Sequence, residues 1–168
     1  MKQRDSEYWK VKLSLIPHRE GGHFREIYRS EGSSKIVRAG GESQVLRNHS
    51  TAIYFLLQSG EMNALHRIKS DEVWHFYDGS RLAVHEIDTT GNLITHMLGL
   101  DIESGESPVV VIKAGNWFCA EVADADTFTL AGCTVSPGFD FDDFELADKN
   151  SLLELYPEYK EFVEKFTV

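Results

Sequence analysis

The stretch "GEMNALHRIKSDEVWHFYDG", residues 60–79, decides the expected fold. Between its two glycines lie two histidines, one glutamate and an aromatic run that is typical of a strand. Five residues separate Gly60 from His66, three separate Ile68 from Glu72, and six separate Glu72 from Gly79. Residues two apart on a strand face the same side, so His66 and Ile68 should share one face. A short turn should then bring Glu72 beside them.

This spacing resembles the first motif of the cupin superfamily, G-x5-H-x-H-x3,4-E-x6-G, at four of its five fixed positions. The exception is Ile68, which stands where the second histidine belongs. The second motif of that superfamily resembles "KAGNWFCAEV", residues 113–122, where Gly115 is kept but Phe118 occupies the histidine position. A transition metal needs at least three nitrogen or oxygen donors from the protein. We therefore expect no metal and no cofactor.

The remaining sequence indicates an all-β protein with a short helix at each end. Asp5-Ser6 is a plausible helix cap for a segment that reaches about Leu15. At the other end, Pro157 begins a segment whose apolar residues recur at helical spacing. Between them, turn signals separate short runs rich in β-branched and aromatic residues, at 24–29, 51–58, 74–77, 82–88, 93–98, 109–112, 117–122 and 127–135.

Longer stretches resemble one uncharacterised cupin family, often described as similar to the dTDP-4-keto-6-deoxysugar 3,5-epimerases. They are "LIPHREGGHFREIYRS" (15–30), "STAIYFLL" (50–57), "HRIKSDEVWHFYDG" (66–79), "CTVSPGFDFDDFELA" (133–147) and "LYPEY" (155–159). The resemblance implies a cupin double-stranded β-helix, that is, a jelly-roll barrel, as a single domain over residues 1–168. It also implies a homodimer and a pocket that opens at one end of the barrel, but no established reaction.

The candidate site is built around His66 and Glu72. An imidazole titrates near neutral pH, so His66 is the expected base, and Glu72 is expected to orient it. A purely structural hydrogen-bonded pair is the alternative. The expected ligand-binding residues are Trp74, Phe118, Ile68, Tyr54, Arg47 and His75. Tyr54 or Tyr28 is the candidate acid, and Arg25 or Arg47 is the candidate group that binds an anion.

Two other signatures are interpreted as structural. Glu20-Gly21-Gly22 is expected to be a turn before the first strand. Phe139 and Phe141 alternate with acidic residues as in a half-buried strand, so they are expected to form barrel wall rather than a ligand site.

Three functions remain open. The first is a metal-independent epimerase or isomerase acting on a keto-sugar or a related polar metabolite. The second is a cupin that binds a small molecule without turnover. The third is a metal-dependent oxygenase or isomerase, which would require His75, His85 or Glu121 to replace the missing ligands.

Composition limits the partners. The chain has 168 residues, 42% of them hydrophobic and 26% charged, with a net charge of −10. Such a surface disfavours nucleic acid and anionic membranes but says little about a small molecule, which is the expected ligand because of the pocket that the resemblance implies. No apolar run follows the charged beginning of the chain. We therefore expect no signal peptide and a cytoplasmic protein in which Cys119 and Cys133 are reduced.

Overall fold

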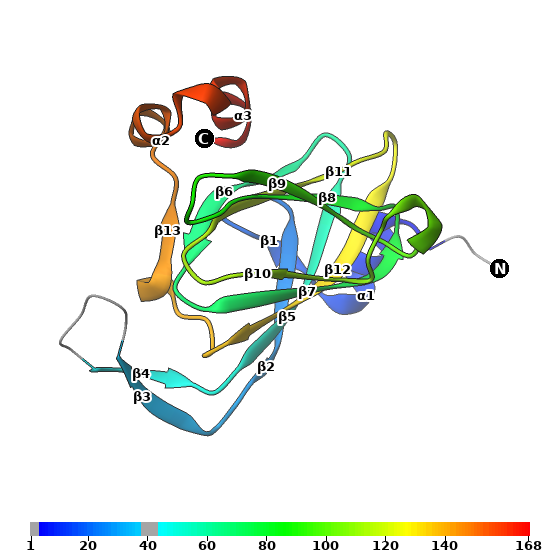
Figure 1. Ribbon diagram of the computed structural model, residues 1–168. Coiled ribbons are helices and arrows are strands. Elements are labelled where there is room, and N and C mark those ends of the chain that lie inside the picture. Colours follow the sequence, from blue (N-terminus) through cyan, green and yellow to red (C-terminus); the bar gives the residue numbers. More distant parts are fainter. Residues whose placement is uncertain (1–3, 38–43) are drawn as a thin grey trace.

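The computed structural model describes residues 4–37 and 44–168, and within them two antiparallel sheets enclose an apolar interior (Figure 1). The larger sheet has six strands in the order β1-β2-β5-β12-β7-β10. These strands are β1 (Ile16–Pro17), β2 (His23–Arg29), β5 (Thr51–Gln58), β12 (Phe128–Ser136), β7 (Asp71–Gly79) and β10 (Val109–Ile112).

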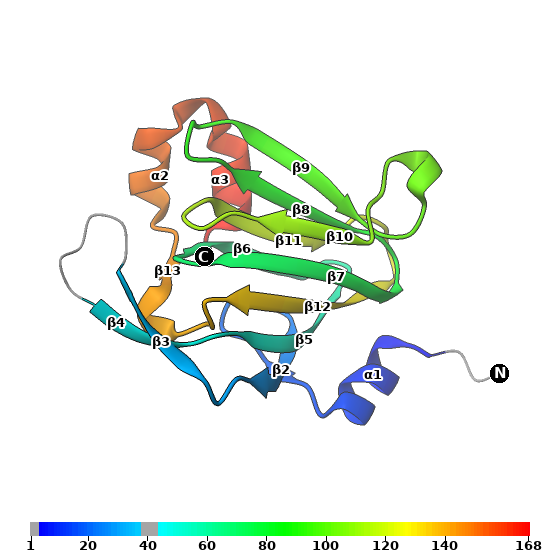
Figure 2. The same ribbon diagram turned by 60° about the horizontal axis from the view of Figure 1, so that its bottom comes forward.

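The smaller sheet has five strands in the order β13-β6-β11-β8-β9. They are β13 (Phe144–Leu146), β6 (Met62–Ile68), β11 (Trp117–Val122), β8 (Leu82–Ile87) and β9 (Leu93–Leu98). A separate hairpin of β3 (Ser33–Val37) and β4 (Gln44–Asn48) extends away from the barrel beside β13 (Figure 2). This arrangement confirms the expected jelly-roll barrel.

Helices cover the outside of both sheets. Helix α1 (Ser6–Leu13) begins at Asp5, whose side chain accepts a hydrogen bond from the Tyr8 amide at 2.8 Å, as the sequence predicted. It lies against the six-stranded sheet, where the Trp9 indole donates to Asp78 at 2.8 Å. Helices α2 (Lys149–Leu155) and α3 (Lys160–Phe166) lie over the outer face of the smaller sheet (Figure 2).

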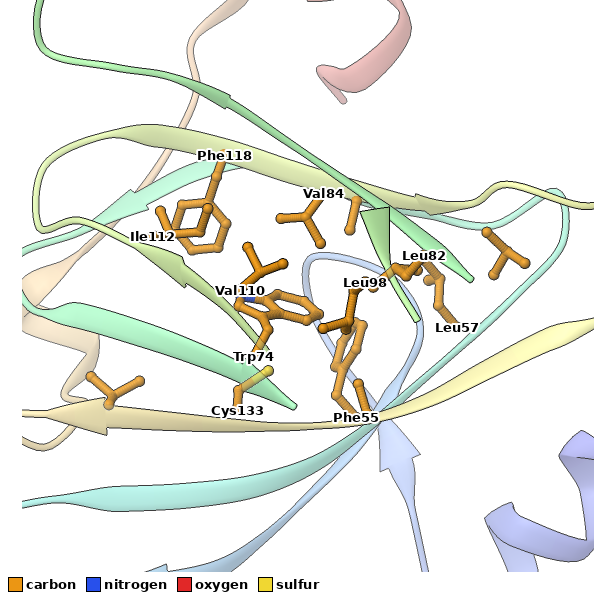
Figure 3. Packing of buried hydrophobic residues seen from close by; sticks show 14 of the residues in the cluster. Phe55, Leu57, Trp74, Leu82, Val84, Leu98, Val110, Ile112, Phe118 and Cys133 are labelled. Atoms are coloured by element: carbon orange, nitrogen blue, oxygen red, sulfur yellow. The ribbon is translucent and has the colours of Figure 1, made fainter. Parts of the chain in front are cut away.

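Two groups of buried side chains hold these layers together. The inner group fills the barrel, into which Trp74 points from the larger sheet and Phe118 from the smaller one (Figure 3). The outer group joins the smaller sheet to the C-terminal helices through Leu65, Trp117, Leu152, Val163 and Phe166. The predicted C-terminal apolar stripe is thus confirmed as the face that packs on the barrel.

The structure also corrects the expected elements. Helix α2 and the β3-β4 hairpin were not predicted, because neither carries a strong periodic pattern. The segment after β12 is not a strand: Phe141–Asp143 forms a 3-10 helix, η2, which Asp140 caps with its side chain. Two further single turns of 3-10 helix are η1 (Ile102–Ser104) and η3 (Pro157–Tyr159). Among the described residues, no helix is long and apolar enough to cross a bilayer.

The outer packing predicts a large effect of Phe166→Ala. Phe166 is 1% exposed against the smaller sheet, so its truncation should lower the free energy of unfolding by about 3–5 kcal/mol. Leu155→Ala, at a 66% exposed position on the neighbouring helix, should change it by about 0.5 kcal/mol or less. Urea denaturation measures both; equal effects would mean that the C-terminal helix does not pack as described.

Candidate functional site

A cavity of about 280 Å³ opens between the inner face of the six-stranded sheet and strand β6. The side chains of the cavity wall come from rows of paired residues that run across neighbouring strands. Across β7, β12, β5 and β2, one row of paired residues is Trp74, Cys133, Ile53 and Glu26, and the next is Glu72, Val135, Thr51 and Arg29. All eight line the cavity. The alternation expected for β7, with Glu72 and Trp74 facing inward, is therefore the alternation observed.

Two β-bulges add polar groups to this wall. The register of β2 against β5 shifts between Glu26 and Tyr28, and the register of β6 against β11 shifts at Asn63. An extra residue changes which face the following side chains occupy. Consequently Glu26 and Arg29, three residues apart, both line the cavity, and so do Asn63 and His66.

Glu20 also enters the cavity, and a glycine turn makes this possible. Gly21 and Gly22 both have positive φ, at 103° and 71°, and a Cβ on Gly21 would lie 2.0 Å from the Met62 carbonyl oxygen. This close approach lets the Ala64 amide donate to the Glu20 carbonyl at 2.7 Å. The segment Glu20-Gly21-Gly22, which was interpreted as only a turn, therefore also places a carboxyl group in the cavity.

Contacts from both ends of its ring fix His66, which is 3% exposed. Nδ1 lies 2.7 Å from the Ala64 carbonyl oxygen, and because a carbonyl only accepts, Nδ1 carries the proton. Nε2, the ring atom left as the base, lies 3.5 Å from Glu20 Oε2. The same Glu20 oxygen accepts from the Asn63 amide at 2.8 Å. The Ala64 carbonyl, rather than Glu72, therefore makes the orienting hydrogen bond that the sequence analysis assigned to Glu72, and Glu20 lies where it can stabilise a proton on Nε2.

A second histidine lies on the other side of Glu20. His18 Nδ1 is 3.6 Å from Glu20 Oε2 and accepts from the Glu20 amide at 3.4 Å. Burial lowers the pKa of His18, and the nearby Glu20 carboxylate only partly offsets this. His18 is therefore a neutral imidazole at neutral pH. His18 was not predicted from the sequence, because its position in the cavity depends on the loop before β2.

Burial raises the pKa of Glu72 to about 8, and the neighbouring charge of Glu20 adds to the effect. The Cys133 thiol hydrogen-bonds to this carboxyl group and partly opposes the shift. Burial also raises the pKa of Cys133 itself, so the thiol stays protonated. At neutral pH, then, Glu72 is largely a neutral carboxylic acid that can donate a hydrogen bond.

Four of the expected binding residues do not line the cavity. Tyr54 and His75 lie on the outer face of their strands, where Tyr54 contacts the Tyr77 ring and His75 contacts Thr134. Strand alternation is the reason, since their neighbours in sequence face inward. Arg47 is held by Asp143 through two hydrogen bonds, of 2.7 and 3.1 Å, and fastens β4 to η2.

Phe118 is the fourth expected binding residue that does not line the cavity. It faces the barrel interior, as its place in the motif predicted, but it is completely buried behind His66, with ring centroids 4.0 Å apart. Conversely, Phe139 and Phe141, which were interpreted as barrel wall, both line the cavity together with Asp140. Ile68 and Trp74 also line it, as the motif spacing implied.

The residues present do not fit a metal ion. At the positions where the cupin motifs carry the second and last histidines, Ile68 and Phe118 are apolar and buried. Within residues 4–37 and 44–168, no group of three or more His, Cys, Asp or Glu could hold one. The suggested substitutes are far from this arrangement: His85 packs on Phe162 and Phe166 beside Glu121, on the outer face of the smaller sheet.

The shifted pKa of Glu72 makes stability depend on pH. Glu72 binds a proton more tightly in the folded chain than in the unfolded chain, where its pKa is near 4.5. Stability should therefore fall as pH rises from about 5 to 8 and level off above that. Glu72→Gln should remove this decline and be more stable than the parent by about 1–3 kcal/mol at pH 8.

Urea denaturation at a series of pH values measures this effect. The control is Glu145→Gln, which changes an exposed carboxyl group on β13 that pairs with Arg67. If the unfolding free energies of the parent and Glu72→Gln ran parallel from pH 5 to 8, Glu72 would be an ordinary ionised carboxylate.

Comparison with known proteins identifies the family of the chain. Residues 7–147 match the model of the Cupin superfamily (DUF985). The uncharacterized protein YML079W of Saccharomyces cerevisiae is 28% identical over 137 residues, which cover 77% of this chain and 68% of the yeast protein. Protein SO0799 of Shewanella oneidensis is 39% identical, with a TM-score of 0.86 over 99% of both chains.

A hypothetical protein from Leishmania major is 31% identical, with a TM-score of 0.88 over 97% of this chain and 98% of that one. An oxalate decarboxylase of Bacillus subtilis shares the fold at 13% identity, with a TM-score of 0.55 over 89% of this chain and 36% of the decarboxylase. The family model covers residues 7–147 and the related structures share the barrel: the chain belongs to the DUF985 family of the cupin superfamily.

Proposed function

We propose that this cupin is a metal-independent isomerase or epimerase, which moves a proton at a carbon next to the carbonyl group of a small polar metabolite. One observation carries the proposal. A single cavity contains an imidazole with a free ring nitrogen and a carboxyl group whose pKa is about 8. Pairs of titratable groups with such different environments are typical of acid–base sites.

In this proposal His66 is the base. Its Nε2 accepts the proton from the substrate carbon, and the electron pair moves onto the carbonyl oxygen to give an enolate. The imidazolium that forms lies 3.5 Å from Glu20, whose carboxylate stabilises the positive charge. Because Nδ1 donates to the Ala64 carbonyl throughout, the ring keeps its orientation while Nε2 gains and loses the proton.

Glu72 is the acid. As a neutral carboxyl group it can hydrogen-bond to the developing enolate oxygen, or return a proton to carbon from the side opposite His66. The tyrosines first considered for this role, Tyr54 and Tyr28, do not line the cavity. Since Glu72 and Trp74 belong to adjacent rows of one sheet, the acid and an aromatic wall are held in fixed register.

Solvent deuterium exchange tests the proposal. Metal-free protein, prepared by dialysis against EDTA, is incubated in D2O with a panel of small keto-sugars, and deuterium at carbon is followed by NMR. We expect exchange by the parent protein and a loss of about 100-fold or more in His66→Gln, which keeps much of the buried volume. His75→Gln, a change on the outer face of β7, is the matched control.

Other outcomes assign other functions. Exchange that continues at the parent rate in His66→Gln would remove His66 from the reaction. Exchange that stops on chelation and returns with added manganese or iron would favour metal-dependent chemistry. Saturable binding of panel members without any exchange would make the protein a binding cupin.

A further inference from the structure

The charges around the cavity restrict what can bind there. Four carboxyl side chains line it: Glu20, Glu26, Glu72 and Asp140. Among the described lining residues, the only permanent cation is Arg29, and none is a lysine. With Glu72 protonated, the carboxyl groups of Glu20, Glu26 and Asp140 face the single guanidinium of Arg29. A phosphate or carboxylate group on a ligand would be repelled by this wall, in which Glu20 is buried while Glu26 and Asp140 are 40% and 42% exposed.

Arg29 is also fully engaged. Glu26 holds its guanidinium through Nε at 3.0 Å and Nη2 at 2.7 Å, while Nη1 donates at 3.1 Å to both Asn48 and the Phe139 carbonyl. The hydrogen bonds to Glu26 raise the pKa of Arg29 further. A phosphate that bound Arg29 through two N–H groups would have to compete with Glu26, which already holds two of the five and repels a second anion.

The other arginines nearby lie outside the residues that line the cavity. Arg47 is held by Asp143 and also lies 3.9 Å from Asp140, so it offsets part of the charge of that lining carboxyl group. Arg19 stacks over the Phe141 ring at 4.1 Å.

The hydrogen-bonding groups distinguish an uncharged ligand from a cationic one. Trp74 Nε1, a donor, and Asn63 Oδ1, an acceptor, are buried and have no hydrogen-bond partner among the described residues. Both residues line the cavity and are at most 2% exposed. Each atom is buried beneath the cavity surface, so a ligand reaches it only where a neighbouring side chain moves aside, and a ligand that pairs both atoms must accept and donate. An ammonium group only donates, whereas hydroxyl and carbonyl groups together do both.

The size of the cavity also favours a small ligand. At about 280 Å³ it lies just below the range of about 300–1,000 Å³ that is common for small-ligand pockets. That volume suits one sugar-sized molecule, and a nucleotide attached to it would have to extend out of the cavity past the exposed carboxyl groups of Glu26 and Asp140. Phe24 and Phe55 add apolar walls on which the carbon face of a sugar can pack.

We propose that the ligand is a free, uncharged, sugar-sized hydroxycarbonyl compound, and that phosphorylated and nucleotide-linked forms are excluded. This inference rests on the proposed function for the reaction but not for binding: charge, size and hydrogen-bonding pattern select the ligand whether or not turnover follows. It also separates this chain from enzymes whose substrate is a nucleotide sugar.

Matched probes test the selection. D-xylulose and D-fructose are compared with D-xylulose 5-phosphate and D-fructose 6-phosphate, with a dTDP-linked 4-keto-6-deoxysugar and with tetramethylammonium. Binding to the intact chain is measured by ligand-observed NMR, and deuterium exchange is recorded in the same samples. We expect at least one free sugar to bind tenfold or more tightly than its phosphate and than the other two probes.

Each result has a defined meaning. Equal or tighter binding of a phosphate, of the nucleotide sugar or of tetramethylammonium overturns the inference, and so does the absence of saturable binding of both free sugars. Binding of a free sugar without deuterium exchange supports the inference on the ligand and contradicts the proposed reaction. Deuterium exchange into the sugar phosphates alone supports the proposed reaction and contradicts the inference on the ligand.

A variant pair tests the hydrogen-bonding argument separately. Trp74→Phe removes the indole N–H but keeps an aromatic ring, and should weaken binding of the free sugar about three- to tenfold. Trp117→Phe is the control, because Trp117 is also buried but belongs to the outer packing group. Equal sugar affinity in the two variants would show that the ligand does not use the Trp74 N–H.

Discussion

The structure depends on placing two carboxyl groups, Glu20 and Glu72, in one cavity of an otherwise apolar barrel. Taking such groups out of water is costly unless they are neutralised or paired. The fold uses both solutions: Glu72 gains a proton, with a pKa of about 8, while Glu20 accepts a hydrogen bond from the Asn63 amide. The difference between the two carboxyl groups supplies an acid and an anion in the same small space.

The backbone devices that produce this arrangement are local irregularities in regular strands. In β2 and β6 a bulge turns a second polar residue toward the cavity, and the Gly21-Gly22 turn brings Glu20 against β6. A barrel built by strict alternation would present fewer polar groups to its interior. Bulges commonly re-aim side chains next to functional sites, and here they account for Arg29 and Asn63.

The sequence predicts the barrel and part of the site for a physical reason. Apolar alternation and turn residues are local signals, and the spacing of Gly60, His66, Glu72 and Gly79 fixes two adjacent strands. That spacing sufficed to place His66, Ile68, Glu72 and Trp74 around one cavity. It could not identify Glu20, His18 or Asn63, because their positions follow from a loop and a bulge whose geometry depends on the neighbouring strand. Tyr54 and Arg47 were predicted from their chemistry alone. Tyr54 lies on the outer face of its strand, and Arg47 is held outside the cavity by its ion pair with Asp143.

The central claim is that Glu72 carries a proton at neutral pH while the Ala64 carbonyl orients His66 as the base. NMR of protein labelled with 13C at the glutamate carboxyl carbon, with Glu72 assigned by comparison with Glu72→Gln, measures the first half directly. The account predicts that the Glu72 signal titrates with a midpoint near pH 8 and is that of a carboxylic acid at pH 6. A midpoint near the ordinary value of 4.5 would contradict it, because Glu72 would then be a second carboxylate and could not act as the acid.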